Sequence, residues 1–186
     1  GTSRVVILGS SYSVEEKAVA TMIEKYSDVK WVVAPHHIDE ARIAEIEDTF
    51  KGRTVRATEL GNGKGQTTSV LILNTMGDLG GLYKLGDIAI VGGGWGKGIH
   101  NVLEPAAHGC AVIWGPNAEK FQEAQKLRSL GAGIQVENQW QLVEQLERWL
   151  DDDEDRKMMG MKADEAVSEG TGATRKVLKT IGEFWT

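Results

Sequence analysis

The sequence predicts an α/β protein with a doubly wound parallel sheet, and three observations carry that prediction. Short apolar segments of strand length alternate with segments of helical periodicity, which is typical of parallel strands covered by helices on both faces. The 23 glycines far outnumber the three prolines and cluster just after apolar segments. The length of 186 residues suits one compact domain. We therefore expect a single Rossmann-like domain over residues 1–186, with no internal repeat and no interdomain linker.

Seven segments have the apolar, β-branched composition of buried strands, and we expect a sheet of about six strands from them. They are, in chain order, Arg4–Leu8, Lys30–Ala34, Arg53–Thr58, Val70–Leu73, Asp87–Val91, Ala111–Trp114 and Gly133–Val136. Ligands of such sheets bind at the carboxyl ends of the strands. The loops that follow these segments are therefore the candidate functional loops.

The segments between the strands have helical periodicity or helix-start signals. In the first of them Ser13 lies three residues before Glu16, which is the spacing of a capping box. Gly61–Gly65 reads as a flexible loop. The predicted helices run from Ser13 to about Tyr26 and over Ile38–Phe50, Asp78–Leu85, Asn101–His108, Asn117–Leu130, Gln139–Leu150, Asp152–Ser168 and Thr171–Trp185.

The composition excludes several classes of protein. With 21 Lys and Arg against 27 Asp and Glu, the net charge is -6, so the chain lacks a strongly basic nucleic-acid footprint. A small anionic ligand remains compatible, because a local nest of amides can hold it. The single Cys110 excludes an internal disulfide and a cysteine zinc cluster. No apolar run approaches the roughly 20 residues of a membrane helix, and the opening segment does not resemble a secretory signal.

The loop Gly92–Gly98 is the strongest candidate site, with five glycines in seven positions. Glycines such as Gly93 and Gly94 let the backbone come close to a ligand, and amides at the following helix start favour a phosphate or carboxylate. Lys97 adds a positive charge. The spacing fits neither the dinucleotide fingerprint nor the ATP phosphate loop, which argues against a standard NAD or ATP site.

Asn101 and Glu104 open the helix after this loop and have two interpretations. In the structural one, Asn101 caps the helix and Glu104 reaches back from its third position. In the functional one, the Glu104 carboxylate accepts hydrogen bonds from a ribose diol. Taken as an isolated motif, capping is the favoured interpretation.

The loop Asn74–Leu79 also follows a strand and opens a helix. Its amides are placed to hold a phosphate or to read a base edge, whereas the plain alternative is a turn with Asp78 near the positive helix end. Gly80 and Gly81 weaken that helix by up to about 1 kcal/mol each, and nothing local explains them.

Adjacent histidines follow the second strand, in Pro35-His36-His37. Neighbours in sequence point apart, and no Cys, Asp or Glu cluster joins them at ligand spacing, so a metal site is not predicted. Hydrogen bonding to an anion fits better. His100 is interpreted as a loop residue and His108 as a surface residue.

Taken together, these motifs resemble 3-deoxy-D-manno-octulosonic acid (Kdo) transferase, over nearly the whole chain. The order of the motifs is more specific than any one of them, and Gly96–Asn101 resembles the form of the Bacteroidetes group. The segments that carry the resemblance are Gly9–Ser11, Asn74–Leu79, Leu82-Tyr83, Val91–Gly93, His100–Ala107, Gly115–Asn117 and Phe121–Ala124.

The resemblance implies the C-terminal, donor-binding half of a GT-B glycosyltransferase of about twice this length. Such an enzyme transfers Kdo from CMP-Kdo to a lipid A precursor, with inversion and without a bound metal or other cofactor, in lipopolysaccharide biosynthesis. The membrane anchor, the acceptor site and the catalytic base would belong to an N-terminal half that this sequence does not contain. The full-length enzyme would lie at the cytoplasmic face of the inner membrane, and this half alone would be cytoplasmic and inactive.

Carried over motif by motif, the resemblance implies a donor site in the strand-end loops. Cytidine carries a ribose with two free hydroxyls, so ribose binding becomes the favoured role of Glu104, with capping as a compatible second role. The expected donor-binding residues are Ser10, Ser11, Pro35, His36, Met76, Gly77, Asp78, Leu79, Gly93, Gly94, Lys97, Asn101 and Glu104.

Two departures from the family pattern stand out. His36 or His37 occupies a position where the family commonly has arginine, so the cationic contact to phosphate becomes pH-dependent or is lost. Asn74 replaces a common aspartate, which affects the turn more than binding.

Three other functions remain as alternatives. One is a GT-B donor domain for a UDP- or GDP-sugar, and another is a noncatalytic α/β binding module. An NAD dehydrogenase is disfavoured by the missing fingerprint and by the lack of an acidic residue at the expected distance.

Overall fold

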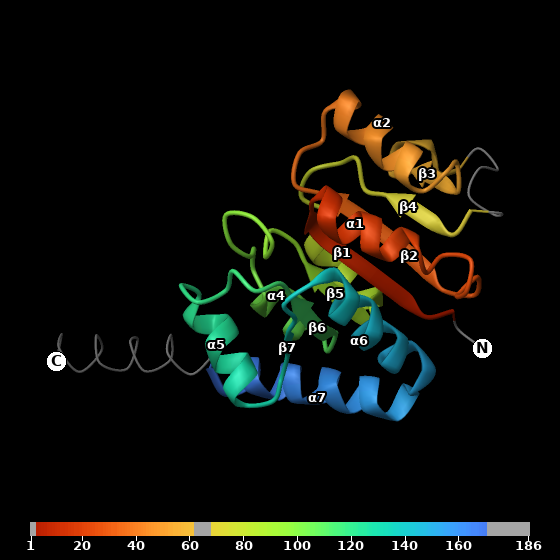
Figure 1. The fold of residues 1–186 in the computed structure, drawn as a ribbon. Helices are drawn as coiled ribbons and strands as arrows, with labels where there is room; N and C mark the ends of the chain where they lie inside the picture. The colour runs from red at the N-terminus through yellow and green to blue at the C-terminus, as the bar shows by residue number, and fades with distance from the viewer. Residues whose placement is uncertain (1–2, 62–67, 171–186) are drawn as a thin grey trace, which may run out of the picture.

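The computed structural model describes residues 3–61 and 68–170 and contains a seven-stranded, all-parallel sheet with helices on both faces (Figure 1). The strand order is β3-β4-β2-β1-β5-β6-β7. The predicted fold class is therefore confirmed. The strands are β1 Val5–Ser11, β2 Lys30–Pro35, β3 Thr54–Arg56, β4 Val70–Ile72, β5 Ile88–Val91, β6 Ala111–Trp114 and β7 Ile134–Gln135.

Helices occupy most of the segments between the strands. Two of them, α3 and α4, are single turns that follow strand-end loops, and the 3-10 turns η1 (Ala57–Glu59) and η2 (Tyr83–Leu85) complete two connections. The α-helices are α1 Ser13–Ala20, α2 Glu40–Thr49, α3 Leu79–Leu82, α4 Leu103–Ala106, α5 Gln122–Ser129, α6 Gln139–Asp151 and α7 Asp153–Gly170.

The sheet has a separate hydrophobic core on each face, because successive strand side chains point to opposite sides. On one face Leu8 and Trp31 pack with Ile46 of α2 and Trp149 of α6. On the other face Ile7, Val91 and Trp114 lie among side chains of η2, α4, α5 and α7. Because helices cover both faces of the sheet, a ligand can reach it only at the ends of the strands, where the loops lie.

The strand order reverses at β1. From β1 the chain adds β2 on one side, and it later returns to add β5 on the other side. In open parallel sheets the ligand crevice lies at such a switch point, outside the carboxyl ends of the strands. The fold therefore predicts that a ligand would bind among the loops that follow β1, β2, β4 and β5.

All seven apolar segments join the sheet, so the expectation of about six strands was too low. β1 continues to Ser11 through an irregularity at Ser10, whose φ of 52° lies in the left-handed region. α1 ends at Ala20 rather than near Tyr26, because the backbone N–H and the hydroxyl of Thr21 both donate to the Ala18 carbonyl. The apolar side chains beyond it, Met22, Ile23 and Tyr26, stay buried, which explains why their spacing resembled more helix.

Several other elements are shorter than expected. β7 covers only Ile134–Gln135, and α3 ends at Leu82, where the 3-10 turn η2 follows. β3 ends at Arg56, before η1, and α4 covers only Leu103–Ala106. α5 begins at Gln122 instead of Asn117, because the backbone N–H and side-chain amide of Asn117 donate to carbonyls of the glycine loop. Residues 62–65 of the predicted loop and the helix expected over 171–185 lie outside the described residues.

Candidate functional site

The loops that carry the expected site residues lie together at the carboxyl edge of the sheet. Ser11 is paired with Pro35 in the parallel register, and Gly9 is paired with Val91. The ends of β1, β2 and β5 are therefore adjacent, and the end of β4 lies beside β2. Chain segments that are distant in sequence thus form one edge around the β1–β5 switch point (Figure 1).

The glycine loop after β5 is closed by its own backbone. The N–H groups of Gly96 and Gly98 both donate to the Gly93 carbonyl, at 2.9 and 3.2 Å, and His100 N–H donates to the Gly92 carbonyl at 3.2 Å. An added Cβ on Gly94 would lie 2.5 Å from the backbone nitrogen of Gly115. Internal packing and hydrogen bonding thus account for much of the glycine content, which the sequence analysis attributed to sharp turning of the backbone and close approach to a ligand.

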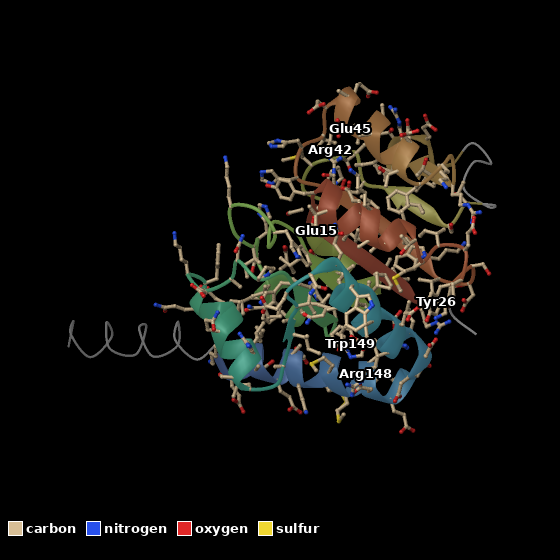
Figure 2. All side chains as sticks on the ribbon, viewed as in Figure 1. Glu15, Tyr26, Arg42, Glu45, Arg148 and Trp149 are labelled. Carbon is tan, nitrogen blue, oxygen red and sulfur yellow. The ribbon has the colours of Figure 1, made fainter. Side chains whose placement is uncertain are left out.

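The buried carboxylate of Glu15 holds this loop through a backbone amide. Glu15 Oε1 accepts a hydrogen bond from the Gly93 N–H at 2.8 Å, and Glu15 Oε2 accepts one from the Tyr12 N–H at 3.2 Å. Figure 2 shows Glu15 on α1, near the loop that follows β5. Burial raises the pKa of Glu15, while the amide hydrogen bonds act in the opposite direction. Because Glu15 occupies the Gly93 N–H, a ligand contact of Gly93 needs another atom.

The predicted capping box of α1 is wrong by one residue. Glu15, not Glu16, reaches back to the helix start, where Tyr12 is the cap residue. Glu16 is fully buried instead, where it accepts a hydrogen bond from the Ser11 hydroxyl at 2.6 Å and pairs with Arg42 of α2. The Ser11 hydroxyl is therefore bonded inside the protein.

The turn after β4 presents an open surface at the same edge. The Asn74 side chain is bonded to Thr58, and the Thr75 hydroxyl donates to Asp78 at 2.6 Å. Gly77 has a φ of 89°, a conformation that favours glycine. Met76 is 83% exposed, an unusual state for a large apolar side chain that is available for contact with a ligand.

Glu104 faces α3 rather than its own helix start. The cap residue of α4 is Val102 and not the expected Asn101, although the Asn101 side chain accepts a hydrogen bond from the Leu103 N–H at 2.9 Å. The predicted return contact from Glu104 is absent from the described residues. An added Cβ on Gly80 would lie 2.5 Å from Glu104 Oε1, so the carboxylate lies directly against α3. The buried Tyr83 lies close by, and its pKa is raised by burial and then by the Glu104 charge.

His36 belongs to an imidazole cluster that the sequence did not reveal. Its ring centre lies 4.6 Å from that of His100 and 4.5 Å from that of His37, and it stacks on Tyr12 at 5.1 Å. His100 was interpreted as an ordinary loop residue, and no local signal indicated this contact. Only the adjacency of the β2 and β5 loops in the fold brings the rings together.

Lys97 lines a polar pocket of about 610 Å³ beside the start of α5. Lys120 and Arg128 also line it, together with the acidic Glu119 and Glu137. The volume lies in the range of small-molecule sites.

The described residues contain neither a candidate metal site nor a helix that could span a membrane. No group of three or more His, Cys, Asp or Glu among them is arranged to hold a metal ion. Within the same residues, no helix is long and apolar enough to cross a bilayer.

Comparison with known proteins gives relatives in sequence and in fold. No known family profile matches the chain. Over 136 residues it is 36% identical to the 3-deoxy-D-manno-octulosonic acid transferase of Aquifex aeolicus, which covers 72% of this chain and 37% of that enzyme. The chain thus spans little more than a third of the length of that relative.

Two solved structures describe the fold relationship. The C-terminal CMP-Kdo binding domain of WaaA from Acinetobacter baumannii has a TM-score of 0.79 at 24% identity, with 89% of this chain and 90% of that chain covered. The Anabaena protein HepE in complex with UDP has a TM-score of 0.67 at 14% identity, covering 98% of this chain and 49% of that chain.

Proposed function

From its sequence relationship to the Kdo transferases and its C-terminal-domain fold, we propose that this chain is the donor-binding domain of a Kdo transferase. The whole enzyme would be an inverting GT-B glycosyltransferase that moves Kdo from CMP-Kdo to a lipid A precursor in lipopolysaccharide biosynthesis. One observation carries the proposal on the structural side: loops after β1, β2, β4 and β5 meet at the switch point of a parallel sheet.

The exposed groups at this edge suit a nucleoside phosphate. Glu104 is exposed and forms no hydrogen bond within the described residues, so its carboxylate is available to a ribose diol. The turn at Met76 and Gly77, which precedes α3, is open and would contact the nucleobase. His36 and Asn101 would lie toward the phosphate. The remaining donor-binding residues predicted above stay predictions at this site.

The rest of the enzyme would supply what this chain does not contain. We propose that residues 1–186 form one nucleotide-sugar-binding domain and that an N-terminal acceptor domain holds the lipid A precursor, the catalytic base and the membrane contact. The enzyme would then act at the cytoplasmic face of the inner membrane. The reaction would need no resident metal or organic cofactor.

A UDP-sugar donor is the second candidate, favoured by the fold similarity to HepE in complex with UDP. The two functions differ in the nucleobase that the Met76–Leu79 turn must bind, which is cytosine for CMP-Kdo and uracil for a UDP-sugar. A noncatalytic binding module, the third possibility, predicts that no nucleotide binds at all.

Amide spectra of the isotope-labelled chain, titrated with CMP, UMP and GMP, test these alternatives. We expect CMP to bind weakly, because cleft closure normally adds contacts from an opposite domain. Shifts should appear at 36–37, 76–81 and 100–104, and α6 and α7 should stay unchanged. Preference for UMP or GMP would favour another donor, and shifts confined to distant helices would overturn the donor-site proposal.

A further inference from the structure

The imidazole cluster at the β1–β5 switch point is built from separate loops. His36 and His37 follow β2, His100 follows the glycine loop, and the Tyr12 ring stacks against His36 and, at 6.1 Å, against His100. The His100 ring also packs on the loop backbone, since an added Cβ on Gly93 would lie 3.3 Å from it. The geometry thus holds His100 and His36 side by side at the edge where a ligand would enter.

The cluster has no anionic partner in the described part of the chain. No carboxylate there forms an ion pair or hydrogen bond with the three imidazoles. The titratable side chains in ring contact with His36 or His100 are Tyr12 before α1 and His37 after β2, while the buried Glu15 of α1 is bonded to the amide of Gly93, on which His100 packs. Glu15 directs its oxygens to the Gly93 and Tyr12 amides rather than to an imidazole.

Protonation of the cluster is disfavoured without an added anion. Partial desolvation, and secondly the nearby His37, lower the pKa of His36, whose side chain is otherwise exposed. Burial, and secondly the nearby His36, lower the pKa of His100. Both effects disfavour the protonated imidazoles, and an anion placed between the two rings would act in the opposite direction by favouring their charged form.

We propose that His36 and His100 bind the phosphate of the nucleotide together and take up a proton from solvent when it binds. This inference rests on the proposed function and deepens it, because it assigns His100 to the site and makes donor affinity depend on pH. An arginine, in contrast, would carry its charge at every physiological pH. The ligand chemistry is a phosphodiester monoanion attached to a nucleoside.

The number of protons taken up on binding determines how steeply the dissociation constant depends on pH. If binding takes up one full proton, the dissociation constant rises about tenfold for each unit increase in pH, and partial uptake gives proportionally less. We expect a rise of about three- to tenfold per unit between about pH 6 and about pH 7.5. A neutral nucleoside at the same site should show no such dependence.

The methyl phosphodiester of CMP is the probe, because its single negative charge is constant over this range, and cytidine is its neutral counterpart. Calorimetry in two buffers of different ionisation enthalpy measures protons taken up on binding. Histidine ring signals report the site directly. Those of His36 and His100 should shift toward the protonated form when the diester binds, while that of His108 should not respond.

Variants separate the imidazoles from other titrating groups. His100→Asn and His36→Asn should each weaken diester binding at pH 6 by about three- to tenfold and reduce proton uptake. His108→Asn is the matched control and should change neither. Glu15→Gln, checked first for native amide spectra, should keep the pH dependence, because the proposal assigns the proton to the imidazoles.

The outcomes are distinguishable. If cytidine and the diester both bind but the diester takes up no proton, the donor site survives and this inference is overturned. If proton uptake disappears in Glu15→Gln and persists in His100→Asn, the proton belongs to Glu15 and the inference is likewise wrong. If neither probe binds at any pH, the proposed function fails and the inference fails with it.

Discussion

Gly80 and Gly81 are adjacent in one short helix, yet the structure separates them. Sequence reasoning treats both alike, as two residues that weaken α3. A Cβ on Gly80 would lie 2.5 Å from Glu104 Oε1, whereas a Cβ on Gly81 would meet nothing within 4 Å. Gly80 therefore makes room for the Glu104 carboxylate, and Gly81 serves as its natural control.

We expect Gly80→Ala to weaken CMP binding by about tenfold and Gly81→Ala to leave it unchanged. The displaced carboxylate would lose a charge-assisted hydrogen bond to ribose, which is typically worth about 1.5–3 kcal/mol. Both variants should be as stable as the wild type or gain up to about 1 kcal/mol, because alanine favours helix. Titration with CMP and 2′,3′-dideoxy-CMP checks this, since only Gly80→Ala should lose discrimination between them. Equal loss in both variants would point to a disturbed α3 instead.

Glu104 itself should matter for binding and not for folding. It is exposed and accepts no hydrogen bond in the described part of the chain, so Glu104→Gln should change the free energy of unfolding by less than about 0.5 kcal/mol. CMP affinity should fall by about tenfold or more, because the charged acceptor is lost. Urea denaturation and CMP titration measure the two quantities. A wild-type chain that binds CMP and its dideoxy analogue equally well would contradict the ribose contact.

At the scale of elements, α1 and the glycine loop form one unit through Glu15. The carboxylate is 1% exposed and holds two backbone N–H groups, one from each element. A loop this rich in glycine has high entropy when unfolded, so a fixed internal acceptor is what gives it one conformation. The loop is thereby ordered before any ligand arrives.

Glu15→Ala should therefore destabilise the fold by about 2–3 kcal/mol, because it leaves the Gly93 N–H buried without an acceptor. Glu24→Ala is the control: Glu24 is an exposed carboxylate paired with Arg53, and its loss should cost less than about 1 kcal/mol. Urea unfolding gives both values, and hydrogen exchange at Gly96 and Gly98 should accelerate only in Glu15→Ala. Equal destabilisation by the two variants would show that Glu15 does not fix the loop.

Sequence predicted the elements better than their contacts. β6 covers the expected Ala111–Trp114, and α2, α6 and α7 begin and end within two residues of expectation, because their apolar periodicity is local information. The Glu15 contact with Gly93 spans 78 residues, and His36 meets His100 across two loops. Such contacts depend on strand order, which no local pattern contains. The capping box was expected one residue too late because Ser13 is a usual cap residue, whereas Tyr12, which occupies the cap position, is not.

At the scale of the whole molecule, the parallel topology explains why residues scattered along the chain were grouped correctly at one edge. Every strand points the same way, so each strand-end loop predicted from sequence had to lie at the carboxyl edge. The order of strands then decides which loops are neighbours. That order places the β1, β2 and β5 loops together and leaves β7 at the far end of the sheet.

The same arrangement limits what this chain does alone. Glycosyl transfer needs a base within hydrogen-bond reach of the acceptor hydroxyl. Glu15 is buried behind the glycine loop and bonded to two amides, and Asp78 is bonded to Thr75. Glu104 lies against Gly80, and the proposed function assigns its carboxylate to the ribose hydroxyls. None of these three carboxylates is therefore positioned as a base toward an acceptor.

We accordingly expect the isolated chain to bind CMP but not to transfer Kdo. The chain spans 37% of the Aquifex aeolicus relative, and the missing length is where the proposal puts the base and the acceptor site. The test combines the purified chain, CMP-Kdo generated in place and lipid A precursor in detergent, with Kdo-modified lipid measured by mass spectrometry. If the isolated chain has no transferase activity, it should give no more product than the protein-free control. Product above that control, abolished in Glu104→Ala, would show that these strand-end loops perform the transfer and that the donor-half proposal is wrong.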